Sequence, residues 1–293
     1  MKRLLILATL LVTAALAIAS CGGDSDGDNS PGELNAIPGN SELVVGSNRF
    51  AFALVDAENR RIVQETDEGV HIQLYFGDEL KGETDADFTW AIEDVTGFWT
   101  ANLDFDQAGE WRVEATVTQG GEESTLTIRF PVTETGFAVN IGEEAPASDN
   151  LTLSSEPNIK RVTTDPEPDE AFYEMTVAEA LEAGKPFVVV FATPAFCQTQ
   201  FCGPALDNVK EAKQQFADDV NFIHIEPYEL TDEGTLVTGG EQNAPVPVAA
   251  TQDWRLRTEP WIFIVGADGI VQARIENSVS VAELTQVLEA VAG

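Results

Sequence analysis

Basic side chains are scarce in this chain. Lysine and arginine together number 16 against 50 aspartates and glutamates, which gives a formal net charge of −34 over 293 residues. Such an acidic surface repels nucleic acids and anionic lipid headgroups, so nucleic-acid binding is excluded. The hydrophobic content of 43% is ordinary for a globular protein, which excludes a disordered acidic chain. The length predicts two domains.

Cysteine and histidine are also scarce, with three and two residues. Because a metal site needs several ligands, the isolated His71 is interpreted as a structural residue of a predicted strand. We expect no metal and no other cofactor. Cys21 lies near the N-terminus, whereas Cys197 and Cys202 are separated by only four residues. The thiol chemistry of the folded protein is therefore concentrated at one point of the chain.

The N-terminus has the pattern of a secretory signal over residues 1–20. Two basic residues follow Met1, and residues 4–19 are almost wholly apolar. The small residues before Cys21 resemble the lipobox of bacterial lipoproteins. This resemblance implies that acylated Cys21 anchors the mature protein to the lipid bilayer of the bacterial cell membrane, in an extracytoplasmic location. The alternative is an ordinary cleaved signal with an incidental cysteine at this position.

The pattern of residues 21–170 predicts a tether, an all-β module and a linker. Residues 21–40 are rich in Gly, Asp, Ser and Asn, and are expected to form a flexible tether. Residues 41–136 contain six or seven short segments in which apolar and polar residues alternate, separated by turn residues. This pattern predicts a β-sandwich and resembles immunoglobulin-like modules. We interpret it as a spacer or a docking module. Residues 137–170, rich in Pro and acidic residues, are expected to be a linker. Within them, the run from Ile141 to Pro146 followed by Leu151-Thr152-Leu153 resembles the entry segment of redoxin-type domains.

Helical and strand patterns alternate from residue 171 onward. Thr176 and Glu179 form a capping box, which predicts the start of a helix. The apolar run 186–191 is typical of a buried central strand. The further predicted elements are a helix that starts around Pro204, a strand at 220–225, a hairpin at 261–275 and a last helix from Ser280.

This order of elements resembles that of thioredoxin. The dithiol lies between a strand and a helix, and Glu259-Pro260-Trp261 precedes the hairpin. The resemblance implies a thioredoxin-like α/β fold over 171–293, with Cys197 and Cys202 as the redox pair and Pro260 as a cis-proline facing them. The sequence departs from the thioredoxin pattern in having four residues between the cysteines instead of two. Glu259 would also place an anion near the thiols.

The roles of the two cysteines are not equivalent. A thiolate is the attacking species, and a helix N-terminus favours the anionic form. Cys202 lies immediately before the predicted helix and is expected to receive this benefit most directly. A disulfide requires Cα atoms within about 7 Å, and residues five apart in a continuous helix are farther apart than this. Either Cys197 therefore lies in a loop, or the first turn of the helix is distorted or unwinds on oxidation. We favour Cys197 as nucleophile with Cys202 resolving, although the triplet Cys202-Gly203-Pro204 matches thioredoxin in the opposite assignment.

The sequence thus predicts a membrane-anchored thiol–disulfide oxidoreductase. It would act on protein thiols or disulfides of secreted or membrane proteins through Cys197 and Cys202, with Pro260 shaping the substrate groove.

Three alternatives remain. The cysteine spacing resembles peroxiredoxins of the Q type, with Arg255 or Arg257 as a candidate arginine, but Pro194 stands where that family has a threonine. Copper delivery, as in Sco-like proteins, would require His224 as a third ligand beside the two thiolates. In the last alternative, the disulfide is purely structural and stabilises a non-catalytic binding module.

Overall fold

The computed structural model of the chain describes residues 34–56, 58, 60–61, 69–92, 95–119, 121–240 and 242–292. These residues fall within one compact unit that begins at Leu34. The predicted signal sequence, Cys21 and most of the predicted tether lie outside the described residues. Among the described residues, no helix is both long enough and apolar enough to span a bilayer.

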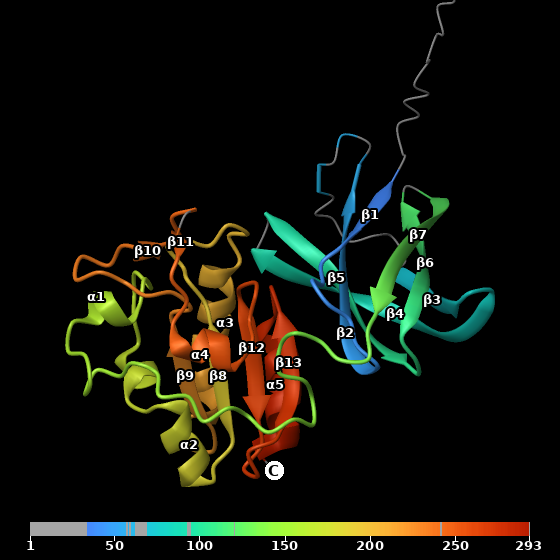
Figure 1. Ribbon diagram of the computed structural model, residues 1–293. Coiled ribbons are helices and arrows are strands. Elements are labelled where there is room, and N and C mark those ends of the chain that lie inside the picture. The colour runs from blue at the N-terminus through green and yellow to red at the C-terminus, as the bar shows by residue number, and fades with distance from the viewer. Residues whose placement is uncertain are drawn as a thin grey trace, which may run out of the picture. The chain divides into compact units, whose positions relative to one another are not determined.

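The first part of the described chain is an antiparallel seven-stranded sheet with the order β1-β2-β5-β4-β3-β6-β7 (Figure 1). Its strands are β1 (Asn35–Pro38), β2 (Gly46–Val55), β3 (Val70–Phe76), β4 (Glu79–Ile92), β5 (Thr96–Phe105), β6 (Gly109–Gln119) and β7 (Glu122–Val132). The long strand β4 pairs with β3 through its first half and with β5 through its second half. One strand therefore belongs to both halves of the sheet.

The two halves of this sheet enclose an aromatic core. Phe50 of β2 packs against Phe130 of β7, with ring centroids 5.0 Å apart, and Phe105 of β5 contacts Trp111 of β6. All four side chains are buried in a single cluster. Facing layers with a shared apolar interior are what the alternating pattern predicts, and the all-β region is confirmed. Residues 35–38 belong to the predicted tether over 21–40, but they form the strand β1, in which Ala36 and its neighbours pair with β2.

The second part of the described chain is built on a four-stranded sheet with the order β13-β12-β8-β9. Only β8 and β9 run parallel, and the other neighbours are antiparallel. The strands are β8 (Phe187–Phe191), β9 (Asn221–Ile225), β12 (Trp261–Val265) and β13 (Val271–Glu276), and a separate short pair is formed by β10 (Thr238–Gly239) and β11 (Ala244–Pro245). The helices are α1 (Ile159–Val162), the 3-10 turn η1 (Glu170–Tyr173), α2 (Val177–Ala183), α3 (Cys202–Phe216), α4 (Ala249–Asp253) and α5 (Val281–Ala292).

The strand β8 is wholly buried because helices cover both faces of the sheet. Val188 and Val190 pack into a cluster with residues of α3 and α5. Phe187, Val189 and Phe191 point to the opposite face and pack with residues of α2 and α4. Each fully buried side chain of this kind contributes about 1.5–3 kcal/mol. This two-sided burial explains the continuous apolar run of β8.

The segment predicted as a linker is packed against the second sheet. Ala138, Val139 and Ala145 are buried, and the backbone N–H of Gly142 donates to the carbonyl of Val271 in β13. This stretch is therefore packed against the second sheet, because its apolar side chains belong to the same buried cluster as Val271 of β13.

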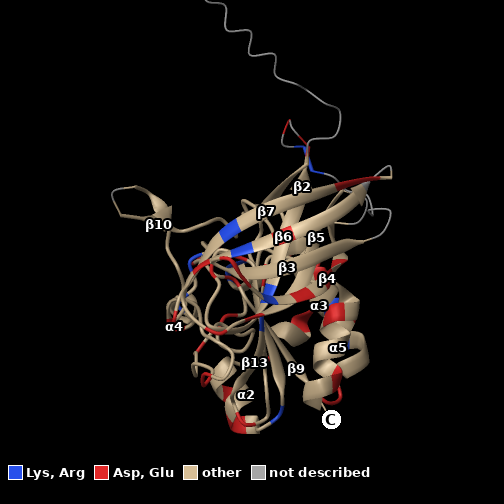
Figure 2. Cartoon of the chain, turned by 90° about the vertical axis from the view of Figure 1, so that its right-hand side faces the viewer, with Lys and Arg blue, Asp and Glu red and all other residues tan. Residues whose placement is uncertain are grey.

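Acidic side chains gather on the outer faces of the second part of the chain. Figure 2 shows them along α2 and α5. Glu179 in the first turn of α2 belongs to a complete capping box with Thr176, as predicted. Carboxylates in the first turn also interact favourably with the helix dipole.

Candidate redox site

The two cysteines lie where the central strand leads into a helix. The strand β8 ends at Phe191, a loop follows, and α3 begins at Cys202. Cys197 lies in the loop and forms a disulfide with Cys202, with Cα atoms 5.9 Å apart. Of the two arrangements that the sequence allows, the structure has the one in which Cys197 lies outside the helix. The close approach is possible because the loop turns back, and Gln200 takes a left-handed conformation with φ of 66°.

The environments of the two sulfur atoms differ. Cys202 is fully buried, with 0% of its surface exposed, whereas Cys197 is partly exposed. The backbone N–H of Cys202 donates to Cys197 Sγ at 3.3 Å, and the hydroxyl of Thr199 lies 3.3 Å from the same sulfur. The helix N-terminus therefore points at Cys197. This corrects the expectation that Cys202 benefits most, because a helix N–H points outward from the first turn toward the preceding loop.

Pro260 lies at the same end of the sheet as the disulfide loop. It directly precedes β12, and its peptide bond with Glu259 is cis, as the resemblance to thioredoxin implies. Trp261, the first residue of β12, pairs with Phe191, the last residue of β8. The strand register thus brings Pro260 to the edge from which the loop with Cys197 emerges. Pro260 itself is buried.

Two carboxyl groups, those of Glu226 and Glu259, lie near this end of the sheet. Glu226 directly follows β9, which runs parallel to β8, so both strands end at the same edge. One oxygen of Glu226 accepts hydrogen bonds from the backbone N–H and the hydroxyl of Thr164, each at 2.9 Å. The Thr164 hydroxyl in turn accepts from the backbone N–H of Ala195 at 3.2 Å, two residues before Cys197. Glu226 is therefore linked to the disulfide loop.

Burial dominates the protonation of these acids. It raises the pKa of Glu226 to about 7, and the hydroxyls of Thr193 and Thr164 offset this only in part. Burial also raises the pKa of Glu259, against the opposing effect of the Tyr228 hydroxyl. Sequence reasoning had noted Glu259 but missed Glu226. The available signal was an acid at the carboxyl end of an apolar strand predicted to neighbour the dithiol strand.

His224 is a packed structural residue. Its Nε2 lies 2.9 Å from the Ala192 carbonyl, which can only accept, so Nε2 carries the proton. Its Nδ1 then accepts from the Tyr173 hydroxyl at 2.8 Å. Burial lowers the pKa of His224 to about 4, which keeps the ring neutral. Because both ring nitrogens are engaged, His224 has no free position for copper, and no cluster suited to a metal occurs among the described residues.

The two arginines considered for a peroxidase are engaged by other groups. Arg255 pairs with the carboxylate of Glu143, and the Arg257 guanidinium lies 4.9 Å from the centre of the Phe137 ring. The structure thus gives both arginines partners in the segment that leads into the second sheet. Neither contact involves a cysteine.

Phe201, between the disulfide loop and Cys202, is buried against the all-β region. Its ring meets that of Phe98 in an edge-on arrangement with centroids 5.2 Å apart. The guanidinium of Arg61 lies 5.4 Å from the centre of the same ring. Phe201, the residue before α3, therefore packs the beginning of this helix against the all-β region.

Comparisons with known proteins support the fold of the second part. The family described as "Thioredoxin-like domain" matches residues 173–292. A search of curated proteins found no match to this chain.

Two of the solved structures that match this chain are distantly similar to it. A thiol:disulfide interchange protein of the thioredoxin family from Chlorobium tepidum is 16% identical, with a TM-score of 0.33, over 53% of this chain and 100% of that one. A CARDB domain from Pyrococcus furiosus is 13% identical, with a TM-score of 0.21, over 35% and 95% of the two chains. Scores this low carry no functional argument. From the family match together with the strand order and the disulfide, residues 173–292 form a thioredoxin-like domain, which follows an all-β region.

Proposed function

We propose that this protein is a thiol–disulfide oxidoreductase in which Cys197 is the nucleophile and Cys202 the resolving cysteine. The observation that carries the proposal is the asymmetry of the disulfide. Cys197 is accessible and receives the first N–H of α3, while Cys202 is fully buried. A donor at a helix N-terminus stabilises a thiolate and makes it available at neutral pH.

The reaction follows from these positions. The Cys197 thiolate attacks one sulfur of a substrate disulfide, which forms a mixed disulfide and releases the other substrate sulfur as a thiolate. Cys202 then loses its proton, and its thiolate attacks Cys197 Sγ. This step closes the Cys197–Cys202 disulfide and releases the second substrate thiol, so two electrons pass to the substrate. The same steps in reverse oxidise a substrate dithiol.

We place substrates among secreted or membrane proteins, with this protein held at the extracytoplasmic face of the membrane by Cys21. The support for this location is the signal-like sequence before Cys21. Pro260 would border the groove that receives the substrate, because it lies at the edge from which the loop with Cys197 emerges.

The decisive experiment is substrate trapping in cells. The Cys202→Ser variant should accumulate mixed disulfides with partner proteins, which dissolve on reduction, because the resolving thiol is missing. The Cys197→Ser variant and the double variant are the matched controls and should trap nothing. Trapping by Cys197→Ser instead would reverse the assignment, and no trapped species with either variant would refute exchange on proteins.

A purely structural disulfide is the second candidate, favoured by the complete burial of Cys202. The two cysteines are only five positions apart in sequence, and closing so short a loop contributes about 2 kcal/mol in the chain-entropy model. The reduction potential separates the candidates. A value between about −100 and −280 mV indicates a catalytic couple, and one below about −300 mV indicates a structural bridge.

A further inference from the structure

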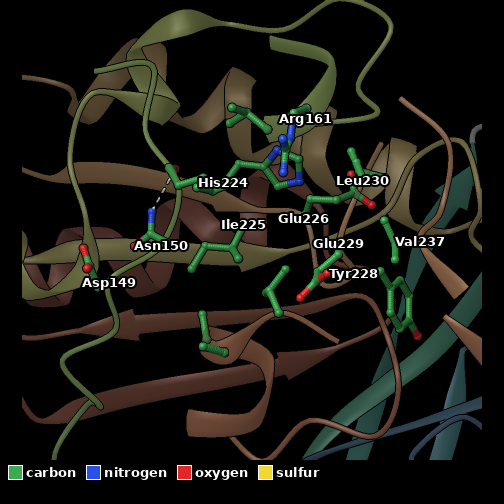
Figure 3. Close-up of a pocket in the computed structure, with 15 residues that line it drawn as sticks. Asp149, Asn150, Arg161, His224, Ile225, Glu226, Tyr228, Glu229, Leu230 and Val237 are labelled. Atoms are coloured by element: carbon green, nitrogen blue, oxygen red, sulfur yellow. Dashed lines mark hydrogen bonds between the residues drawn. The ribbon is translucent and has the colours of Figure 1, made fainter. Parts of the chain in front are cut away.

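A cavity lies beside β9, apart from the cysteines. It encloses about 350 Å³, and neither Cys197 nor Cys202 lines it. Figure 3 shows Asp149 and Asn150 on one side, Tyr228, Leu230 and Val237 on the other, and Ile225 with Glu226 between them. This volume is at the lower end of the range for small-molecule sites. The cavity can therefore hold a compact organic molecule.

Most of the wall is apolar. The apolar lining residues come from β9, α1, the start of α4 and the loops on either side: Leu151, Val162, Ile225, Leu230, Val237 and Val248. Burying an apolar surface against them is worth about 25 cal/mol per Å². A bound molecule should thus have an apolar body.

The charged groups of the cavity are mostly acidic. Its one cationic lining residue, Arg161, is already paired with Glu156 at 3.4 Å and with Asp232 at 3.3 Å. The carboxylates of Asp149 and Glu229, both exposed, make no ion pair with any residue that the structure describes. The neutralised cation and the unpaired acids together favour a positively charged ligand.

Glu226 adds a buried acceptor to the same wall. The residue is only 4% exposed, and its Oε1 has no hydrogen-bond partner in the described part of the chain. The Thr193 hydroxyl also has no hydrogen-bond partner among the described residues, and it lowers the pKa of Glu226. A buried acceptor left without a donor costs about 1–3 kcal/mol.

We propose that the cavity beside β9 binds a small organic cation, with its apolar body against Leu230, Val237 and Ile225 and its protonated amine directed to the carboxylates. An anionic molecule of the same size would face the carboxylates of Asp149 and Glu229 without a free cation to balance them. A bare inorganic cation would leave the apolar wall unused.

The test measures the binding of n-hexylammonium, the probe, to the full chain by NMR titration. Hexanoate has a similar apolar length with the opposite charge, and methylammonium has the charge without the apolar body. We expect saturable binding of hexylammonium at millimolar concentration, and at least tenfold weaker binding of both controls. Equal affinity for hexanoate and hexylammonium would overturn the charge assignment. Equal affinity for methylammonium and hexylammonium would overturn the role of the apolar wall, because general attraction by an acidic surface would then explain the binding.

Variants locate the site. The pair Asp149→Asn and Glu229→Gln should weaken hexylammonium binding about three- to tenfold for each charge removed. Glu233→Gln is the matched control, because Glu233 is an exposed acid of the same loop that does not line the cavity. Val237→Trp should fill the cavity and abolish binding. If the Val237→Trp variant does not fold, the Asp149→Asn and Glu229→Gln variants provide the test. Unchanged affinity of these variants for hexylammonium would refute the proposal.

This proposal does not depend on the redox function. Binding should persist in the Cys197→Ser variant, since no cysteine lines the cavity. A failed substrate trap with intact hexylammonium binding would contradict only the proposed function, and the reverse result would contradict only the cation site.

Discussion

The hydroxyl of Tyr228 donates a 2.8 Å hydrogen bond to Glu259, the residue that precedes the cis peptide bond to Pro260. This contact ties the loop after β9 to the beginning of β12. Tyr228 also lines the cavity beside β9. The Tyr228 side chain therefore borders the cavity beside β9 and also contacts the carboxyl group of Glu259, next to Pro260.

Neutralising Glu259 should accelerate exchange with anionic disulfides. Its carboxylate repels negatively charged substrates at the edge where Cys197 emerges, and like charges raise the barrier to encounter. We expect the Glu259→Gln variant, once reduced, to react several-fold faster with the dianionic reagent 5,5′-dithiobis(2-nitrobenzoate), with the gain shrinking at high salt. Stopped-flow absorbance gives the rate. Glu229→Gln is the control, and an equal gain there would show that only the overall charge matters.

Alkylation should distinguish the two cysteines. After reduction, iodoacetamide should modify Cys197 at least tenfold faster than Cys202, because thiolate access governs this reaction and Cys202 is fully buried. Mass spectrometry of peptides from timed samples measures both rates. Equal rates would mean that the first turn of α3 opens on reduction, which would remove the basis for assigning Cys197 as the only nucleophile.

Glu226 should make the protein less stable as the pH rises. Its pKa goes from an ordinary 4.5 to about 7 in the folded state, chiefly through burial. Between these values the folded chain holds a proton that the unfolded chain has released, so the free energy of unfolding falls with increasing pH. The Glu226→Gln variant lacks this effect. Its stability relative to the parent should improve by up to about 3 kcal/mol between pH 4 and 8.

Urea unfolding at a series of pH values measures this difference. Glu229→Gln serves as the exposed-acid control. A constant difference between the Glu226→Gln variant and its parent across the range would show that Glu226 ionises freely in the folded protein.

His224 should have the opposite influence on stability. Burial lowers its pKa from 6.5 to about 4. Between these values the unfolded chain binds a proton that the folded chain does not, so this contribution to stability is lost as the pH falls from about 6.5 toward 4. Ring ¹⁵N NMR should show a neutral Nε2–H tautomer down to about pH 5, with the exposed His71 as the reference signal. Protonation of His224 near pH 6.5 would contradict its assigned hydrogen bonds.

Much of the architecture could be predicted from local patterns. The apolar run 186–191 predicted a central strand, and β8 is buried on both faces. The alternating segments from Arg49 to Val132 predicted the strands of the all-β region. The capping box at Thr176 and Glu179 marked the start of α2. These predictions succeeded because each element's periodicity reflects the environment on its faces.

Long-range packing is what the local patterns did not show. Local composition predicted a tether before residue 41 and a linker over 137–170, yet Ala36 pairs with β2 and Val139 is buried. Short apolar stretches among polar residues give no periodic signal, and only a partner far away in sequence reveals that they are ordered. The domain boundaries given from sequence stay predictions.

The sequence by itself determined which chemistry is available. It placed two thiols between a strand and a helix, and a proline before the last hairpin. Only the tertiary structure decided that the first N–H of α3 points at Cys197 and that Cys202 is buried. It also brought Glu226 to the same sheet edge, through the parallel pairing of β8 and β9. The physical reason is that residue types are local, whereas burial, donor direction and pKa depend on segments that meet only in the folded chain.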